Sequence, residues 1–310
     1  MTMRILITGA AGYLGSQLGE RLARENEVCG VDIRAGNAAF PVTVMDVRDK
    51  ALAVMLRDKA ITHVVHLASI LQPGPDRERD YDIDVNGTRN VLDACLEAGV
   101  QHFTYTSSGA AYGYHVDNPA WIDEQDALRG NTEFSYSDHK RLIEEMLLEY
   151  RQQHPELKQL IFRPGTVLGA STDNLITNLF RKKRLLAVSG SASPFVFIWD
   201  QDVLNAIESG IERSSTGLFN MAGDGALSID EIGAILGKPV LHVPAAAIAT
   251  ALFVGKLLGL TRYGPEQVNF LRYRPVLSNR RLKEEFGYQP AKSSEDTFRY
   301  FARHALNIPV

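Results

Sequence analysis

The sequence has few of the features that mark secreted, membrane-spanning or nucleic-acid-binding proteins. Two cysteines, Cys29 and Cys95, are too few for a disulfide framework, and we expect buried free thiols in a reducing compartment, the cytoplasm. The longest apolar segment, residues 243–255, contains Pro244, ends before Lys256 and is too short to span a bilayer. A net charge of −4 gives no electrostatic reason to expect a nucleic acid or a membrane as partner.

The sequence also lacks a metal-binding pattern. Its 8 histidines are scattered without the spacing of metal ligands, so we predict no metal site. The 310 residues are 45% apolar and 23% charged, which is ordinary for a globular protein. This length is enough for one large α/β domain, or for one domain with a smaller lobe.

Segments typical of strands and helices alternate through the first half of the chain. The alternation predicts an α/β fold, a Rossmann-like doubly wound parallel sheet with right-handed crossovers. We expect strands at 5–8, 27–31, 42–46, 62–67, 101–106 and 157–162, and helices at 50–59, 81–98 and 136–153. Prolines punctuate the second half. We therefore predict a dinucleotide-binding domain over residues 1–167 and a smaller, partly interleaved substrate lobe over residues 168–310.

Three glycines lie between the first expected strand and the helix that follows it. Gly9 permits a tight turn, Gly12 lets the backbone approach a pyrophosphate, and Gly15 lets the helix pack closely on the strand. The N-terminus of a helix offers N–H groups and a positive dipole end to phosphates. This segment predicts a dinucleotide site.

An acidic residue ends the second expected strand. The Asp32 carboxylate can accept hydrogen bonds from the adenosine ribose hydroxyls and would repel a 2′-phosphate, so NAD is favoured over NADP. Arg34, two residues later, weakens this preference because a guanidinium can pair with a phosphate.

A tyrosine and a lysine four residues apart begin the expected helix at 136–153. Tyr136 and Lys140 share one helix face, and a nearby ammonium group lowers the pKa of a phenol, so Tyr136 could exchange a proton with a substrate oxygen. Ser108 follows the strand at 101–106, at the edge of the sheet where ligands bind, and its hydroxyl could hold the same oxygen. These three residues are the predicted catalytic set.

In the order of its motifs the chain resembles the extended short-chain dehydrogenase/reductase family, in its NAD-dependent epimerase/dehydratase branch. Beside the glycines, Asp32 and the Ser-Tyr-Lys set, the resemblance rests on Asp46–Val47, His66–Ser69, Asn86–Asn90, Ser107–Gly113, Arg163–Gly169, Phe197–Val203, Gly217–Asn220 and Phe286–Pro290. The resemblance implies a Rossmann-like domain, a nicotinamide cofactor, a proton relay through the catalytic set and a homodimer formed by the two long helices. The implied cofactor-binding residues are Gly9, Gly12, Tyr13, Leu14, Gly15, Asp32, Ile33, Arg34, Asp46, Val47, Leu67, Ala68, Ser69, Asn86, Tyr136, Lys140 and Pro164.

The chain also departs from the family pattern. The acid pair that family dehydratases carry after the threonine of the fifth strand is replaced by two serines after Thr106, which disfavours nucleotide-sugar dehydration. Thr166 stands where sugar-nucleotide epimerases often have asparagine, and residues 190–197 lack their usual diphosphate-binding arginine. Arg272 or Arg274 could compensate, or both could be solvated surface residues. The apolar helix at 244–260 could line a substrate pocket, but packing into the core or a dimer contact is favoured.

We therefore predict an NAD(P)-dependent oxidoreductase that transfers a hydride between the nicotinamide and a secondary alcohol or ketone. The alternative is a nucleotide-sugar 4-epimerase, which would use the same relay and retain its NAD. A non-catalytic dinucleotide sensor is a third hypothesis, and the intact Ser-Tyr-Lys set argues against it.

Overall fold

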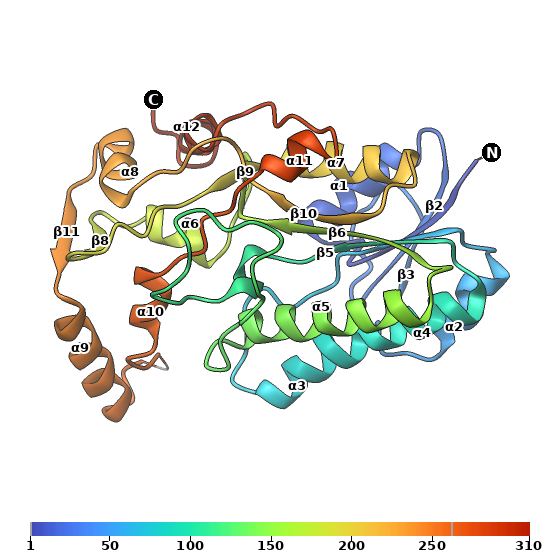
Figure 1. Ribbon diagram of the computed structural model, residues 1–310, viewed down its shortest axis with the longest axis horizontal. Coiled ribbons are helices and arrows are strands. Elements are labelled where there is room, and N and C mark those ends of the chain that lie inside the picture. The colour runs from blue at the N-terminus through green and yellow to red at the C-terminus, as the bar shows by residue number, and fades with distance from the viewer. Residues whose placement is uncertain (1, 262) are drawn as a thin grey trace.

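The computed structural model describes residues 2–261 and 263–310 of the chain, and a seven-stranded parallel sheet forms its centre (Figure 1). The strand order is β10-β6-β5-β4-β1-β2-β3. The strands are β1 (Arg4–Thr8), β2 (Glu27–Asp32), β3 (Val42–Val44), β4 (His63–His66), β5 (His102–Thr106), β6 (Lys158–Pro164) and β10 (Gly217–Met221). The order reverses between β1 and β4, and ligands of such sheets bind in the crevice at the carboxyl ends of these strands.

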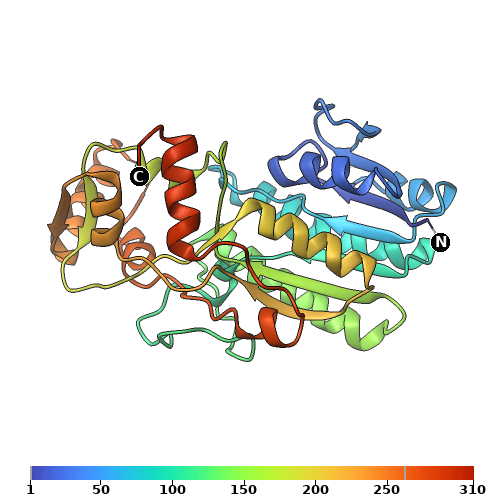
Figure 2. The ribbon, with the colours of Figure 1, turned by 90° about the horizontal axis from the view of Figure 1, so that it is seen from above.

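Helices cover both faces of the sheet, as Figures 1 and 2 show. One face carries α2 (Ala51–Asp58), α4 (Gly87–Ala98) and α5 (Ser135–Gln153), whose apolar sides meet the sheet in one buried cluster. The other face carries α1 (Tyr13–Leu22) and α7 (Asp200–Glu212), which share a second cluster. The prediction of a Rossmann-like doubly wound α/β fold is confirmed.

The helix expected at 81–98 is divided into three parts. A short helix α3 (Arg77–Tyr81) leads into a π-helical turn, η1 (Asp82–Asn86), and α4 follows it. A π-turn contains one extra residue per turn, so it rotates the side chains before it relative to those after it. This rotation accompanies a buried position for Asp84 and an exposed one for Asn86.

The C-terminal lobe is built around phenylalanine rings. Phe180, Phe197 and Phe298 are fully buried and meet edge to face or tilted, with ring centroids 5.1–6.1 Å apart. The elements of the lobe are β7 (Thr166–Leu168), α6 (Leu175–Phe180), β8 (Leu185–Val188), β9 (Phe197–Trp199), α8 (Ile229–Leu236), β11 (Val240–Val243), α9 (Ala245–Leu257), α10 (Gln267–Arg272) and α12 (Ser294–Ala305). Two parallel strand pairs, β7 with β9 and β8 with β11, lie outside the large sheet.

The lobe and the large sheet exchange segments. After β9 the chain returns to the sheet, where α7 covers one face and β10 extends the edge beside β6. Helix α11 (Arg280–Glu284) packs beside β10 before the chain re-enters the lobe at α12. A single cut at residue 167 would therefore remove an edge strand and a covering helix from the sheet.

Two further expectations concern thiols and membranes. Cys29 in β2 and Cys95 in α4 are buried free cysteines, as predicted. Over residues 2–261 and 263–310, no helix combines the length and apolar character needed to cross a bilayer.

Candidate active site

The turn between β1 and α1 has a shape that larger side chains would block. Gly9 has a φ of +69°, and a Cβ there would lie 2.8 Å from the backbone nitrogen of Ala68. A Cβ on Gly15 would lie 2.2 Å from the Gly9 carbonyl oxygen. Gly12 is the N-cap of α1, and its N–H donates to that same oxygen at 3.0 Å. The turn and the first N–H groups of α1 therefore form a cradle for an anion.

Residues that follow the neighbouring strands line the same edge. Leu67, Ala68 and Ser69 follow β4, and the Ala68 N–H donates to Thr8 Oγ1 at 3.3 Å, which holds this segment against the glycine turn. Pro164 ends β6. These four residues of the expected cofactor set thus occupy carboxyl ends of the central strands.

The first residue of α1 is tied to the start of α7. The Tyr13 hydroxyl donates to Asp200 Oδ2 at 2.5 Å, and burial with this carboxylate raises the pKa of Tyr13. A Cβ on Gly169 would lie 2.0 Å from the same carboxylate oxygen and 2.4 Å from the Tyr13 hydroxyl. The glycine at 169 therefore leaves the space that this hydrogen bond needs. Leu14, the next residue, packs against the apolar cluster below α1.

Asp32 lies at the end of β2, where the sequence places a ribose-binding carboxylate. Its carboxylate is buried and accepts hydrogen bonds from the backbone N–H groups of Ala11 (3.0 Å) and Arg34 (3.1 Å). The Arg34 side chain is 73% exposed, and its Nε is 3.9 Å from Asp32. Ile33 is exposed beside them. Backbone amides, rather than the guanidinium, hold Asp32 in place.

An ion-pair cluster surrounds Asp46, one of the residues expected to bind the cofactor. Arg48 binds both oxygens of Asp46 and also binds Asp82, at 2.6–2.9 Å. Hydrogen bonds from Arg48 lower the pKa of Asp46. Val47 is buried beneath this cluster. Asn86 is exposed, and its amide donates to Asp82 at 2.9 Å, so its side chain belongs to this surface cluster.

Ser108 and Tyr136 contact each other, as the predicted catalytic set requires. Ser108 follows β5 and caps the 3₁₀ turn η2 (Gly109–Tyr112) by accepting from the Ala110 N–H at 3.1 Å. Tyr136 is in the first turn of α5 and is partly exposed, and its interaction with the Ser108 hydroxyl acts to lower the pKa of Tyr136. The two hydroxyls therefore share one place at the carboxyl end of β5.

Lys140 lies one turn further along α5 and is buried. Its Nζ donates to the Tyr105 hydroxyl at 2.9 Å and to the Thr106 carbonyl at 3.1 Å, and lies 5.7 Å from the centre of the Tyr136 ring. Burial lowers the pKa of Lys140 to about 8, against the opposing effect of nearby carboxylates. An ammonium group with this pKa is partly deprotonated in mildly alkaline solution.

The electrostatics of Tyr136 differ from the sequence-based expectation. We expected Lys140 to lower the pKa of Tyr136, and this is wrong for the geometry observed. Burial raises the pKa of Tyr136, and the Ser108 hydrogen bond, rather than Lys140, opposes that rise. The Lys140 ammonium binds Tyr105 and the backbone instead, because these acceptors lie within its reach.

Sequence reasoning missed Asp84. This buried carboxylate accepts from the Ile70 N–H at 2.9 Å and from Ser69 Oγ at 3.3 Å, and it lies 2.9 Å from Nδ1 of His139. Its negative charge raises the pKa values of both Tyr136 and Lys140. Asp84, and not Asn86, therefore faces the predicted site. Its place on the helix face of residues 84, 88, 91 and 95, which is otherwise buried, is the signal that could have revealed it.

Aromatic side chains lie beside Tyr136 on the lobe side. The rings of Tyr114, Phe134 and Phe270 contact one another with centroids 5.0–6.3 Å apart, and Phe134 immediately precedes α5. Tyr114 is partly buried, and desolvation together with the charge of an ionised Tyr136 raises the pKa of Tyr114. This aromatic cluster joins the catalytic set to α10, which carries Phe270.

Arg274 is the arginine that reaches the aromatic cluster. Its guanidinium lies 3.9 Å from the ring centre of Phe195 and 5.7 Å from that of Phe270, and it donates to the carbonyl and hydroxyl of Ser193 at 2.9 and 3.0 Å. Burial lowers its pKa to about 10. Arg272 stacks instead on its neighbour Tyr273. Of the two arginines considered from the sequence, Arg274 is the one that contacts the aromatic cluster.

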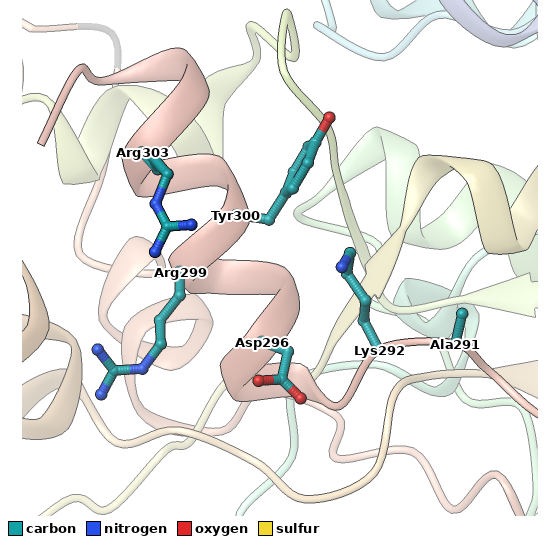
Figure 3. A pocket seen from close by; sticks show the side chains of 6 residues that line it. All are labelled: Ala291, Lys292, Asp296, Arg299, Tyr300 and Arg303. Atoms are coloured by element: carbon teal, nitrogen blue, oxygen red, sulfur yellow. The ribbon is translucent and has the colours of Figure 1, made fainter. Parts of the chain in front are cut away.

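A cavity of about 240 Å³ lies beside α12 in the lobe, and Figure 3 shows its lining. Lys292 stacks on the rings of Trp199 and Tyr300, at 4.6 and 5.4 Å, while Arg299 pairs with Glu295 at 2.8 Å. The arginines lie on one side of α12 and Lys292 with Tyr300 on the other (Figure 3). These cations do not converge on one point, so the cavity adds no residue to the catalytic set.

Comparison with known proteins identifies the family. The model of the NAD-dependent epimerase/dehydratase family matches residues 5–201, which contain the glycine turn, Asp32 and the catalytic set. The chain belongs to this family. The resemblance inferred from the sequence motifs is thereby confirmed.

Curated relatives are distant. An uncharacterized protein of Mycobacterium tuberculosis is 24% identical over 99% of this chain and 85% of its own length. The N-acetyl-α-D-glucosaminyl-diphospho-ditrans,octacis-undecaprenol 4-epimerase of Escherichia coli O157:H7 is 28% identical over 59% of this chain and 54% of its own length.

Solved structures share the fold. The UDP-glucose 4-epimerase of Thermus thermophilus, in complex with NAD, has 24% identity and a TM-score of 0.75, and the match covers 98% of this chain and 99% of that one. The Bordetella bronchiseptica enzyme WbmG, in complex with NAD and UDP, has 22% identity and a TM-score of 0.77, over 99% and 95% of the two chains. At this identity the likeness establishes the fold.

Proposed function

We propose that this protein is an NAD-dependent enzyme that transfers a hydride between the nicotinamide and a carbon bearing a secondary hydroxyl or keto group. The observation that carries the proposal is the contact between Ser108 and Tyr136, with buried Lys140 one helical turn away, at the carboxyl edge that also holds the glycine turn. A proton-transfer set and a dinucleotide cradle on one edge are what such a reaction requires.

The glycine cradle fits a dinucleotide. Gly9 and Gly15 leave no room for a Cβ, so the backbone of the turn stays open to a pyrophosphate. Asp32, fixed by two backbone N–H groups, would accept from the adenosine ribose hydroxyls, and its charge disfavours a 2′-phosphate. When bound, the cofactor supplies the hydride acceptor or donor.

Each catalytic residue would have a distinct task. In alcohol oxidation the substrate O–H proton goes to Tyr136 as the carbon loses its hydride, and reduction reverses both transfers. Ser108 would hold the reacting oxygen beside the phenol. Lys140 would orient the end of β5 through its hydrogen bonds to the Tyr105 hydroxyl and the Thr106 carbonyl.

A nucleotide-sugar 4-epimerase is the second candidate. It would use the same three residues on a retained NAD, with oxidation and reduction of one substrate carbon in each turnover. Arg274 favours it, because a partly buried guanidinium beside Tyr114 and Phe270 could bind a diphosphate while the rings stack on a base or sugar. The neighbouring UDP-glucose 4-epimerase and WbmG structures contain NAD, which supports both candidates.

The decisive experiment compares wild-type protein with Tyr136→Phe. We expect turnover of the active substrate, found with a panel of alcohols, ketones and UDP-sugars, to fall about 10²- to 10⁴-fold, while NAD binding measured by calorimetry is retained. Tyr150→Phe, on the outer part of α5, is the matched control and should keep full activity. Unchanged turnover in Tyr136→Phe would exclude the proposed relay.

Cofactor behaviour separates the two candidates. NAD that stays bound through purification and is not consumed indicates the epimerase. Cofactor that exchanges freely and is consumed in proportion to substrate indicates the reductase. NAD binding without turnover of any substrate in the panel would favour the dinucleotide sensor.

A further inference from the structure

Helix α9 exposes an apolar surface at the end of the lobe. Phe253, Val254 and Leu257 are 59%, 44% and 76% exposed, and beyond the helix Leu258 and Leu260 are 64% and 79% exposed. Figure 1 shows α9 at the extremity of the lobe, far from the edge of the sheet that carries the N-terminus. We call these five side chains the α9 patch.

Packing within the chain does not explain this patch. Helix α9 already buries one side, where Ile248 joins Val188 of β8 and Val268 of α10 in a small cluster. The opposite side is also apolar, so the helix has two apolar faces and uses one of them. A contiguous apolar surface of this kind marks a site of association.

The segment that carries the patch has no acidic residue of its own, and the acids that flank it include Asp230, which pairs with His242 of β11 at 3.2 Å, and Glu266. From residue 232 to residue 265 the chain contains no Asp or Glu, while Lys238 and Lys256 lie within this stretch. Four consecutive exposed cations, Arg181 to Arg184, lead directly into β8. β8 pairs with β11, and β11 leads into α9, so the four cations and the α9 patch flank one small strand pair.

The strand pair itself exposes apolar side chains. Leu186 of β8 and Leu241 of β11 are register partners, and they are 45% and 50% exposed. The lobe therefore combines leucines on the strand pair, the α9 patch beyond one end of the pair and four cations at the other. The net charge of −4 describes the whole chain, so it does not reveal this local combination of cations and apolar side chains.

We propose that this end of the lobe docks on the surface of an anionic lipid bilayer. The α9 patch would enter the boundary between headgroups and acyl chains, and Arg181 to Arg184 would bind anionic headgroups. A symmetric contact between two copies through the α9 patch would cover its apolar side chains but would give Arg181 to Arg184, at the other end of the strand pair, no anionic partner. An anionic bilayer satisfies both the apolar side chains and the cations. The proposal revises the expectation that the chain has no membrane partner, and it is independent of the proposed function.

The test is co-sedimentation of the full chain with vesicles. Wild-type protein should bind vesicles of equal parts phosphatidylglycerol and phosphatidylcholine at least tenfold more strongly than vesicles of phosphatidylcholine alone, and added salt should weaken this binding. The variant Phe253→Ser/Leu257→Ser/Leu260→Ser should lose at least tenfold in partitioning. Val54→Ser/Val116→Ser replaces exposed apolar residues elsewhere and should bind like wild type. Lys182→Gln/Lys183→Gln should lose mainly the preference for the anionic vesicles.

Two results would overturn the proposal. One is wild-type binding to anionic vesicles that is no stronger than that of the triple variant. The other is light scattering that shows a dimer dissociated by the triple substitution while vesicle binding is unchanged, since the patch would then join two copies of the chain. Unchanged thermal unfolding of the triple variant ensures that lost binding reflects the surface.

Discussion

Asp84 and His139 form a buried pair, with the carboxylate Oδ2 2.9 Å from the imidazole Nδ1. The pair joins the π-turn before α4 to the first turns of α5, and His139 is the residue next to Lys140. The same carboxylate holds Ile70 and Ser69 after β4. One side chain thus connects the segment expected to lie along the cofactor with the helix that carries Tyr136 and Lys140.

Removing the charge of Asp84 should move the pH–rate profile of alcohol oxidation to lower pH. Asp84 raises the pKa values of Tyr136 and Lys140, so Asp84→Asn lowers both. Glu144 also raises the pKa of Lys140, and this carboxylate is unchanged in the variant. Tyr105, which interacts electrostatically with Tyr136, and His66, which interacts electrostatically with Lys140, are unchanged as well. The measurement is kcat/KM between pH 5 and pH 10.5. His139→Gln keeps the carboxylate and should shift the profile less, and an unmoved Asp84→Asn profile would contradict this role.

Lys140→Met should stabilise the fold at pH 7 while it removes activity. The buried ammonium has a pKa lowered to about 8, so below that pH the folded state carries a charge that water solvates better. We expect a gain of about 1–2 kcal/mol in the free energy of unfolding by urea at pH 7. The gain should shrink as the pH rises from 8 to 10, because Lys140 of the wild type then loses its proton more readily when folded than when unfolded. A gain that grows over this range would contradict the assignment.

Glu144→Gln should be strongly destabilising. The two Glu144 oxygens accept from Arg163 at 2.5–2.9 Å, Ser107 donates to one of them at 2.5 Å, and both partners of the ion pair are at most 5% exposed. Loss of one buried partner costs about 3–5 kcal/mol, because the guanidinium stays buried without its counter-charge. Urea unfolding measures this cost. Glu97→Gln, which breaks an exposed pair with Arg57, is the control and should cost less than about 1 kcal/mol.

Gly169→Ala should weaken dinucleotide binding. The added methyl group would lie 2.0 Å from Asp200 Oδ2, so the carboxylate must leave its place and the Tyr13 hydroxyl must lose this partner. Since Tyr13 begins the helix that forms the anion cradle, we expect a roughly tenfold or greater loss of NAD affinity by calorimetry, about 1.4 kcal/mol or more. Tyr13→Phe removes the hydroxyl without crowding and should lose less. Equal affinities of Gly169→Ala and wild type would show that the turn does not depend on this contact.

Asp32→Ala should reduce the preference for NAD over NADP. The variant loses the ribose acceptor and the charge that repels a 2′-phosphate, while exposed Arg34 remains available to bind that phosphate. The ratio of the two dissociation constants should fall about tenfold or more. Tighter binding of NADP than of NAD by the wild type would make the assignment of Asp32 wrong.

The fold could be predicted from the sequence largely because its signals are local. The glycine turn, the alternation of apolar strands with amphipathic helices, and the spacing of Tyr136 and Lys140 depend on residues close together in the chain. The strands of the first half lie within a few residues of their expected positions, and β3 ends at Val44, two residues earlier than predicted.

The features that could not be predicted depend on contacts between distant segments. The π-turn at Asp82–Asn86 does not follow from apolar spacing, and neither do the hydrogen bonds that tie Asp84 to Ile70 and His139. The partner of Lys140 is Tyr105, 35 residues away, and the pKa of Tyr136 is governed by burial that only the assembled fold creates. The choice between Arg272 and Arg274 likewise required the position of Phe195.

Because the chain returns from the lobe to the sheet, the lobe cannot be exchanged between related proteins by a single crossover without changing the sheet. Because α7 covers the sheet and β10 forms its edge, a chimaera joined at residue 167 would exchange these two elements together with the lobe. A graft that leaves the sheet intact needs several crossover points, one on each side of α7 and β10. Diversification by single recombination is therefore disfavoured, whereas point changes within the lobe leave the strands and covering helices of the sheet whole.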